Sequence, residues 1–218
     1  FNYSYVINYS LIPNIGDGTN IHVVITATDL AGNTARTEWP EPLTPLPPSV
    51  LFIPGMEASR LYQNDNGTER RRWEPDYQAD VRALYLNQNG TTATQIYTKP
   101  GGVISTIDVP IVGGDIYRTF FEQLASLKSE GTIRDYQVFP YDWRMSPEEV
   151  VSSGAPYESS HRSLEDVIAE LTPTGNKLII VGHSNGGLVA KALMRWLEAT
   201  GKTHLIDKVI FVATPQTG

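Results

Sequence analysis

The amino-acid sequence predicts an α/β fold in which a mostly parallel sheet carries helices on both faces. Two observations predict it. Between residues 49 and 213, short apolar and β-branched runs recur, and amphipathic segments with helical spacing lie between them. Strands that are apolar throughout are buried on both faces, and a helix between successive strands returns the chain to the same end of the sheet. The alternation therefore indicates a doubly covered parallel sheet.

The first strand and helix of this pattern are bounded by turn residues. The run SVLFIP, residues 49–54, predicts a strand that ends at a Pro-Gly pair. Asp115 has the right chemistry for the N-cap of a helix that Gly131 closes. The apolar residues of this helix recur at helical spacing: Tyr117, Phe120, Phe121, Leu124 and Leu127. The run DYQVFP, residues 135–140, predicts the second strand.

The remaining elements follow in the same order. Ser163, with an acidic residue three positions later, predicts the start of a second helix, which Pro173 ends. Its apolar residues are Leu164, Val167, Ile168 and Leu171. The run KLIIV, residues 177–181, predicts a third strand, and residues 188–197 predict a third helix. The run DKVIFVA, residues 207–213, predicts the fourth strand. Residues 62–104 show no clear periodicity and predict a surface excursion or cap.

The first part of the chain has a different character. Apolar residues alternate in IHVVITATD, at Ile21, Val23, Ile25 and Ala27, which predicts a half-buried strand. The stretch ATDLAGNTA resembles the last strands of bacterial immunoglobulin-like domains, so we interpret residues 1–39 as the C-terminal strands of such a domain. A hairpin packed on the main domain is the alternative. Residues 40–48 contain five of the fifteen prolines and predict a stiff linker to residues 49–218.

Composition excludes several classes of function. The chain has 17 basic and 24 acidic residues, a net charge of −7 that disfavours a nucleic-acid partner. It has no cysteine, which excludes disulfides, thiol nucleophiles and Cys-ligated metals. No His, Asp and Glu cluster has metal-ligand spacing, so neither a metal nor another cofactor is expected. The longest apolar runs are too short for a transmembrane segment.

The stretch LIIVGHSNGGLVAKAL, residues 178–193, contains the motif with the clearest chemistry. Gly182, Ser184 and Gly186 form a Gly-x-Ser-x-Gly pattern between a predicted strand and a predicted helix. At such a strand-to-helix elbow the serine is exposed in a strained conformation, and the glycines avoid clashes of Cβ atoms. The alternative is a helix cap or a phosphate-binding turn, but no Lys-Ser/Thr pair or GxGxxG accompanies the motif. We therefore interpret Ser184 as a nucleophile.

A serine nucleophile needs backbone donors for the oxyanion that forms when it attacks a carbonyl. One donor is expected to be the N–H of Asn185, the residue after the nucleophile. The other is expected from the loop after the first strand, where PGM places Met56. Because these donors belong to the backbone, the side chain of Met56 does not matter for this role. An ordinary turn at the end of the strand is the alternative for PGM.

Three motifs together resemble one branch of a known superfamily. VLFIPGMEASRL, FPYDWR and KLIIVGHSNGGLVA, in this order, are similar to the lecithin:cholesterol acyltransferase-like branch of the α/β-hydrolases, and the resemblance runs from about Val50 to Gly218. It implies an α/β-hydrolase-type sheet and acyl-ester chemistry on lipid-like substrates, as in lipases, phospholipases and acyltransferases. It also implies Ser184 as nucleophile, with Met56 and Asn185 as oxyanion donors. The expected partner is a lipid or other acyl ester, at a membrane or lipid surface.

Other residues are weaker candidates for the substrate site. Asp142, Trp143 and Arg144 in YDWR could line it, but an ion pair that locks the loop and a core tryptophan are the favoured interpretations. ERRRW, residues 69–73, could meet anionic headgroups, with Trp73 as a lipid contact, although a solvated run of charge is the default. His183 is interpreted as a packing residue.

Two other functions stay open beside the lipase-like enzyme. One is a surface adhesion or interaction protein whose hydrolase part is inert. The other is a thioesterase or amidase of the same fold. The sequence does not distinguish hydrolysis from transfer of the acyl group to an alcohol, because loop geometry chooses the acceptor. The immunoglobulin-like stretch and the linker lead us to expect a secreted or cell-surface bacterial protein.

The catalytic acid and base are expected beyond Gly218. In α/β-hydrolases the nucleophile comes first in the chain, then the acid, then the histidine. His204 and Asp207 lie between the third helix and the fourth strand, at the end of the sheet opposite Ser184. His161 precedes the nucleophile and breaks the order. We therefore expect residues 1–218 alone to be nearly inactive.

Overall fold

The computed structural model describes most of the chain: residues 24–28, 32–38, 46–92, 95–107, 114–158 and 160–216. Two compact units divide the chain, Phe1–Leu46 and Pro47–Gly218. Their boundary falls within the predicted linker, residues 40–48, most of which lies outside the described residues. The β segment and the α/β part are thus separate packing units.

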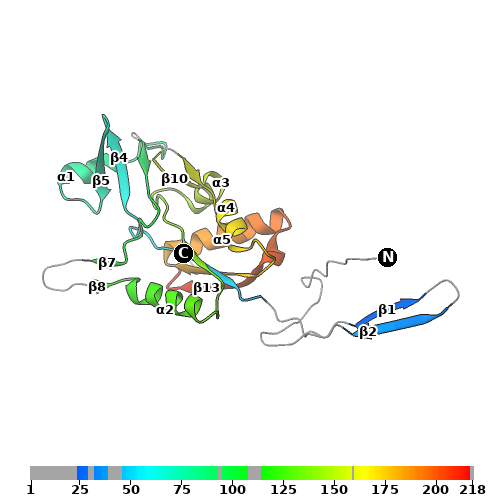
Figure 1. Ribbon diagram of the computed structural model, residues 1–218. Coiled ribbons are helices and arrows are strands. Elements are labelled where there is room, and N and C mark those ends of the chain that lie inside the picture. The colour runs from blue at the N-terminus through cyan, green and yellow to red at the C-terminus, as the bar shows by residue number, and fades with distance from the viewer. Residues whose placement is uncertain are drawn as a thin grey trace. The chain divides into compact units, whose positions relative to one another are not determined.

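The first unit contains a two-stranded antiparallel ribbon, β1 (Val24–Thr28) and β2 (Thr34–Glu38) (Figure 1). The predicted half-burial is not observed, because every described residue of both strands is exposed, Val24 at 41% and Ile25 at 43%. A ribbon of two strands has no second layer to pack on, and the described part of this unit offers none. The first two residues of the predicted apolar face lie outside the described residues.

A four-stranded, all-parallel sheet forms the centre of the second unit, in the order β13-β12-β3-β9. Its strands are β3 (Ser49–Ile53), β9 (Tyr136–Val138), β12 (Leu178–His183) and β13 (Ile206–Val212). Each of the four predicted strands is present, and β12 continues two residues past its predicted end. The predicted α/β fold is confirmed.

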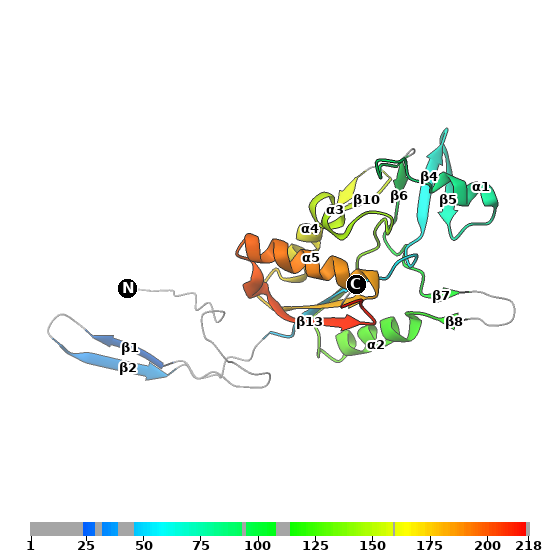
Figure 2. The ribbon, with the colours of Figure 1, turned by 180° about the vertical axis from the view of Figure 1, so that it is seen from behind.

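Helices cover both faces of this sheet (Figure 1 and Figure 2). α2 lies on one face, whereas α4 and α5 lie on the other, where α3 packs against α5. Their bounds are α2 (Arg118–Ser129), α3 (Pro147–Ser153), α4 (Leu164–Leu171) and α5 (Asn185–Ala199). α5 begins three residues before the predicted start, directly after Ser184, so the elbow has no intervening loop.

Strand β3 shows why its run of apolar residues is continuous. Val50 and Phe52 point toward α2, where Phe52 packs edge-on against Tyr117 with ring centroids 4.9 Å apart. Leu51 and Ile53 belong to the core beneath α4 and α5. Because successive side chains of a strand alternate between the two faces, burial on both faces requires an apolar residue at every position.

The helix starts follow the capping chemistry read from the sequence. Ser163 Oγ accepts the N–H of Asp166 over 3.0 Å at the start of α4, as predicted. The Asp115 carboxylate accepts the N–H of Arg118 over 2.7 Å and a weaker bond from the N–H of Thr119. α2 begins at Arg118, so Asp115 caps it from three residues upstream.

A small β subdomain follows the carboxyl end of β3, in a region whose sequence shows no clear periodicity. It consists of β4 (Leu61–Asp65), β5 (Thr68–Trp73), α1 (Gln78–Ala83) and β6 (Ile96–Tyr97), with the strand order β5-β4-β6. The turn between β4 and β5 is Asn66-Gly67, with φ of 51° and 85°. An Asn-Gly pair with two positive φ angles is the strongest short hairpin signal, and it could have revealed this element.

The arginines of the ERRRW segment are paired with carboxylates. Arg71 contacts Asp76 over 3.0 Å, and Arg72 contacts Asp80 over 2.7 Å. Arg70 and Arg71 are exposed, as a solvated charge run requires, whereas the Arg72 side chain is only 11% exposed and its partner Asp80 is buried, so Arg72 departs from that interpretation. No helix in the described ranges has the length and apolar character that a membrane crossing requires. Two further pairs of two-residue strands lie in the described ranges: β7 (Thr106–Ile107) with β8 (Gly114–Asp115), and β10 (Ala155–Pro156) with β11 (His161–Arg162).

Candidate active site

The candidate site lies where two central strands end side by side. β3 and β12 are parallel neighbours, so their carboxyl ends are at the same edge of the sheet. From there the chain runs from β3 toward β9 on one side and from β12 toward β13 on the other. Connections that diverge in this way leave a crevice at the strand ends, which is where open α/β sheets bind ligands.

Ser184 occupies the elbow between β12 and α5. Its φ of 50° and ψ of −121° are strained for a residue with a side chain. Backbone hydrogen bonds hold it there: the Ser184 N–H donates to the Val212 carbonyl over 2.8 Å, and its own carbonyl accepts the N–H of Gly187 over 3.0 Å. The turn therefore fixes the serine at the amino end of a 15-residue helix, where the helix dipole favours negative charge.

The glycines on either side of the serine are required by close backbone contacts. A Cβ atom on Gly182 would lie 2.7 Å from the Cα of Gly187. A Cβ atom on Gly186 would overlap the carbonyl oxygens of Ile53 and Pro54 at the end of β3. The absence of these side chains lets the first turn of α5 pack directly on the end of the neighbouring strand.

The loop after β3 passes beside the elbow. A Cβ atom on Gly55 would lie 3.2 Å from the Cβ of Ser184, so the two backbones are in close contact. Met56 follows, with its side chain 58% exposed. Within the described ranges, neither the Met56 N–H nor the Asn185 N–H has a hydrogen-bond acceptor in the protein. Two unpaired backbone donors thus lie next to the serine, from two different strand ends.

Tyr117, at the start of α2, joins the loop to the residue before the serine. Its hydroxyl oxygen accepts the N–H of Gly55 over 3.1 Å and lies 2.7 Å from Nδ1 of His183. Because the oxygen accepts from Gly55, we assign its hydrogen to the bond with His183 Nδ1, which places the imidazole hydrogen on Nε2. Burial lowers the pKa of His183, which favours the neutral ring, and burial raises the pKa of Tyr117.

Tyr141 makes the matching connection on the other side. Its hydroxyl donates to the carbonyl of Pro54 over 3.0 Å and accepts from Nδ2 of Asn185 over 3.1 Å. The side chain is fully buried, and burial raises its pKa, so the hydroxyl stays protonated. The sequence analysis missed both tyrosines as site residues and interpreted His183 as a packing residue. Tyr141 lies within the PYDWR motif, which was the available signal.

The two tryptophans hold the far end of the same loop. Trp73 Nε1 donates to the carbonyl of Glu57 over 2.6 Å, and Trp143 Nε1 donates to the carbonyl of Ser59 over 3.1 Å. Their rings meet edge to face with centroids 5.2 Å apart. Both indoles therefore anchor the loop that carries Met56, which is a structural role that the sequence analysis did not assign to them.

Comparison with known families decides the class of this protein. The family model of lecithin:cholesterol acyltransferase matches residues 85–218, a range that includes Ser184 and Asn185, whereas Met56 lies before it. The chain belongs to the lecithin:cholesterol acyltransferase family. The activity of this family is of the acyltransferase and lipase type on lipid esters. The comparison with curated proteins gives no match. The immunoglobulin-like character of residues 1–39 stays a prediction.

In this acyltransferase-family chain, Asp142 and Arg144 form the ion pair that the sequence favoured. Arg144 Nε donates to Asp142 Oδ1 over 2.8 Å, and Arg144 Nη1 donates to the carbonyl of Leu84 over 3.0 Å. The side chains of Asp142 and Arg144 are only 4% and 5% exposed, respectively. The ion pair therefore fixes the loop after β9 to the small β subdomain.

Removal of Asp142 is expected to destabilise the fold strongly. Asp142→Ala leaves the Arg144 guanidinium buried without its partner, which costs about 3 to 5 kcal/mol in the free energy of unfolding. Denaturant titration measures this change. Glu148→Ala is the control, because Glu148 pairs with Arg195 at 3.7 Å on an exposed surface and its loss is expected to cost less than about 1 kcal/mol. Equal effects of the two variants would contradict the buried-pair interpretation.

In the described part of this family member, His183 directly precedes the serine, whereas His204 lies at the opposite end of the sheet. His204 lies in the 3₁₀ helix Thr203–Leu205, at the amino end of β13, as the sequence predicted. The sheet separates it from Ser184 by the length of a strand, about 20 Å. Nδ1 of His183 is bonded to Tyr117. In the described part of the chain, Ser184 Oγ has no hydrogen bond to a histidine or carboxylate, so the expected base beyond Gly218 stays a prediction.

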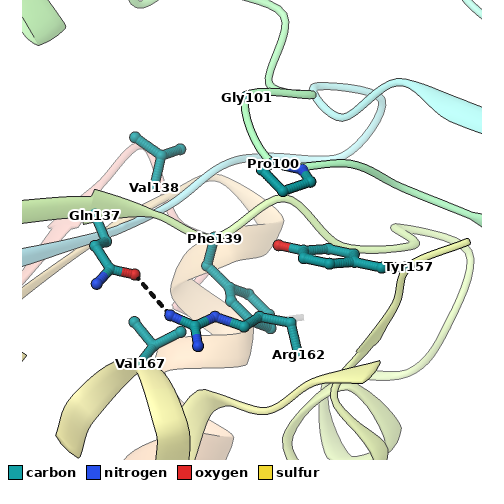
Figure 3. Close-up of a pocket in the computed structure, with 8 residues that line it drawn as sticks. All are labelled: Pro100, Gly101, Gln137, Val138, Phe139, Tyr157, Arg162 and Val167. Carbon is teal, nitrogen blue, oxygen red and sulfur yellow. Dashed lines mark hydrogen bonds between the residues drawn. The ribbon is translucent and has the colours of Figure 1, made fainter. Parts of the chain in front are cut away.

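No group of three or more His, Cys, Asp and Glu residues that could hold a metal occurs within the described ranges. A cavity of about 280 Å³ lies along β9, away from the elbow (Figure 3). Gln137 and Arg162 form part of its wall and are joined by a hydrogen bond of 3.0 Å. None of the predicted site residues lines it. The cavity therefore does not extend the candidate site.

Arg162, in the wall of this cavity, forms a pH-sensitive ion pair with Glu170. Hydrogen bonds from Arg162 lower the pKa of Glu170 from 4.5 to about 2. Because the folded pKa is below the unfolded one, the carboxylate stabilises the fold above pH 4.5, and this contribution is lost as the pH falls toward 2. The Glu170 side chain is 52% exposed, so screening limits the contribution to about 1 kcal/mol.

Glu170→Gln is therefore expected to lower the melting temperature by about 3 °C at pH 7. The difference from the parent protein narrows steadily below pH 4.5, because the parent loses the same charge by protonation. Thermal unfolding of both proteins between pH 7 and pH 3 measures it. A difference that stays constant over this range would show that the carboxylate charge is not involved.

Proposed function

We propose that this chain provides the nucleophile of an enzyme that removes acyl groups from lipid esters through a covalent intermediate on Ser184. One observation carries the proposal. The serine is held with positive φ at the amino end of α5, beside two backbone N–H groups without acceptors. Membership in an acyltransferase family gives the class of substrate. A strained serine in this environment has no structural purpose in the packing of the sheet.

The proposed first step is attack on the ester carbon. A bond forms between Ser184 Oγ and the carbonyl carbon, the Oγ proton passes to a general base, and the carbonyl electrons move onto the oxygen. The N–H groups of Met56 and Asn185 donate to this oxyanion. Each such donor contributes about 3 kcal/mol of transition-state stabilisation. The positive end of the α5 dipole acts in the same direction.

Collapse of this intermediate completes the transfer. The carbonyl reforms, the bond to the leaving alcohol breaks, and the protonated base returns its proton to the alcohol oxygen. The acyl group is then an ester of Ser184. Attack by water releases a fatty acid, and attack by a second alcohol gives a new ester. In the chain order of the superfamily, this base is a histidine that comes after the nucleophile.

The test begins with a fluorophosphonate probe on the full-length gene product. We expect the probe to modify the peptide that contains Ser184 and heat-unfolded protein to remain unmodified, because labelling requires the folded site. The same preparation is then assayed on a phospholipid, an acyl thioester and an acyl amide, with and without a long-chain alcohol. Cleavage of the phospholipid alone supports the proposal. Labelling at another residue would reject the proposal in favour of the adhesion protein. Cleavage of only the thioester or only the amide would reject it in favour of a thioesterase or an amidase.

A further inference from the structure

The peptide group between Pro54 and Gly55 is held at both of its polar atoms. Its carbonyl accepts from the hydroxyl of Tyr141 over 3.0 Å, and its N–H donates to the hydroxyl of Tyr117 over 3.1 Å. Both hydrogen bonds are buried. A peptide that is fixed at its two ends by side chains from different elements cannot rotate about the chain axis without breaking one of the bonds.

The same two hydroxyls also contact the residues on either side of the nucleophile. Tyr117 reaches His183, the residue before Ser184, over 2.7 Å. Tyr141 reaches the side chain of Asn185, the residue after it, over 3.1 Å. Two bridges therefore run from one peptide of the β3 loop to the two neighbours of the serine. We call this arrangement of Tyr117 and Tyr141 the tyrosine clamp.

The clamp controls the donor that the proposed reaction needs. The next peptide along the chain joins Gly55 to Met56 and carries the Met56 N–H. Gly55 has no side chain to restrict its backbone, so the orientation of that N–H depends on how the preceding peptide is held, together with the bond of 3.3 Å that the Ala58 N–H donates to the Gly55 carbonyl of the same peptide. We propose that Tyr117 and Tyr141 are positioning residues that hold the Met56 N–H in the oxyanion hole. This inference rests on the proposed function.

Packing alone does not explain the two hydroxyls. The cluster around Tyr117 contains Phe52, Phe120 and Phe121, which fill the same layer without a polar atom. A buried tyrosine hydroxyl needs hydrogen-bond partners, and each clamp hydroxyl has one partner in the loop and one beside the serine. A phenylalanine would preserve the packing and lose only these bonds. The substitution therefore separates positioning from core packing.

The experiment compares Tyr117→Phe, Tyr141→Phe and the double variant in the full-length gene product. Tyr97→Phe is the matched control. Tyr97 lies in the small β subdomain, is 1% exposed, and donates a hydrogen bond from its hydroxyl to Glu69 over 2.7 Å. The substrates are a carboxylic ester and its thionoester, whose sulfur is a poor acceptor for N–H donors. Melting temperatures are measured for every variant.

Each single clamp variant is expected to lower kcat for the ester by about tenfold and the double variant by about a hundredfold, because a misplaced oxyanion donor loses most of its effect. KM stays within about twofold, and kcat for the thionoester falls by less than about threefold, since sulfur gains little from the donor. Tyr97→Phe retains the parent kcat. If Tyr141→Phe does not fold, the kcat values of Tyr117→Phe for the ester and the thionoester test the inference by themselves.

Two results would overturn the inference. One is a clamp variant that keeps the parent kcat for the ester. The other is an equal loss for ester and thionoester, which would mean a general structural role. The proposed function fails separately, if the parent protein is not labelled at Ser184. If the parent protein is labelled and active and the clamp variants keep its kcat, Ser184 remains the assigned nucleophile and only the positioning role of the tyrosine clamp is rejected.

Discussion

Replacement of Ser184 by alanine lowers ester turnover of the full-length gene product by about a million-fold, the size of loss expected when a serine nucleophile is removed. The reason is that no other group can form the acyl-enzyme. Residual activity then comes only from binding and from the oxyanion donors, which the substitution leaves in place. Single-turnover and steady-state hydrolysis of a soluble ester measure the loss, and the fluorophosphonate label disappears with it.

Two controls make this result specific. Ser184→Ala is expected to keep the fold, because the bonds that hold residue 184 are made by its backbone N–H and carbonyl. Ser152→Ala, on the exposed side of α3, is the matched control and retains full activity. If turnover survives in Ser184→Ala with an intact circular dichroism spectrum, the nucleophile is another residue.

Gly186→Ala is expected to destabilise the fold about as strongly as Asp142→Ala. A Cβ atom at this position would overlap the carbonyl oxygens of Ile53 and Pro54 and would lie 2.7 Å from the carbonyl carbon of Ile53. These are backbone atoms of a central strand, so they cannot rotate away as a side chain could. We expect a loss of about 3 kcal/mol or more in the free energy of unfolding, at the upper end of overpacking effects. Denaturant titration measures it.

The matched control is Gly114→Ala in β8, where an added Cβ atom would meet no heavy atom within 4 Å. This variant is expected to stay within about 0.5 kcal/mol of the parent. The same addition of one methyl group is thus tested in closed and in open space. Similar stabilities of the two variants would mean that α5 does not pack on the end of β3 as closely as described.

Much of the fold could be predicted from local patterns, for identifiable reasons. Four apolar runs became the four strands of the sheet. Burial on both faces explains the continuous apolar run of β3, whereas the predicted burial is not observed for the edge strand β13, most of whose residues are exposed. The Ser163 cap of α4 was readable because the capping side chain and the N–H that donates to it lie three residues apart in the chain. The elbow was readable for the same reason, since its glycines, its serine and its strand-to-helix context are contiguous.

The clamp could not be predicted, because its contacts are distant in sequence. Tyr117 and Gly55 are separated by 62 positions, and Tyr141 and Pro54 by 87. Helical spacing placed Tyr117 correctly in the core, but spacing says nothing about the partner of a hydroxyl. The loop anchors Trp73 and Trp143 were missed as anchors for the same reason.

The parallel pairing of β3 with β12 also has a consequence for how the site comes into being. Leu178 pairs with Ser49, 129 residues earlier, and the loop of Met56 and the elbow of Ser184 leave the ends of these two strands. Long-range parallel pairing closes a large loop and forms slowly compared with a helix such as α5. A chain that has regained its helices but not this pairing therefore has a serine without an oxyanion hole. We therefore expect the recovery of activity during refolding to lag behind the recovery of helical signal.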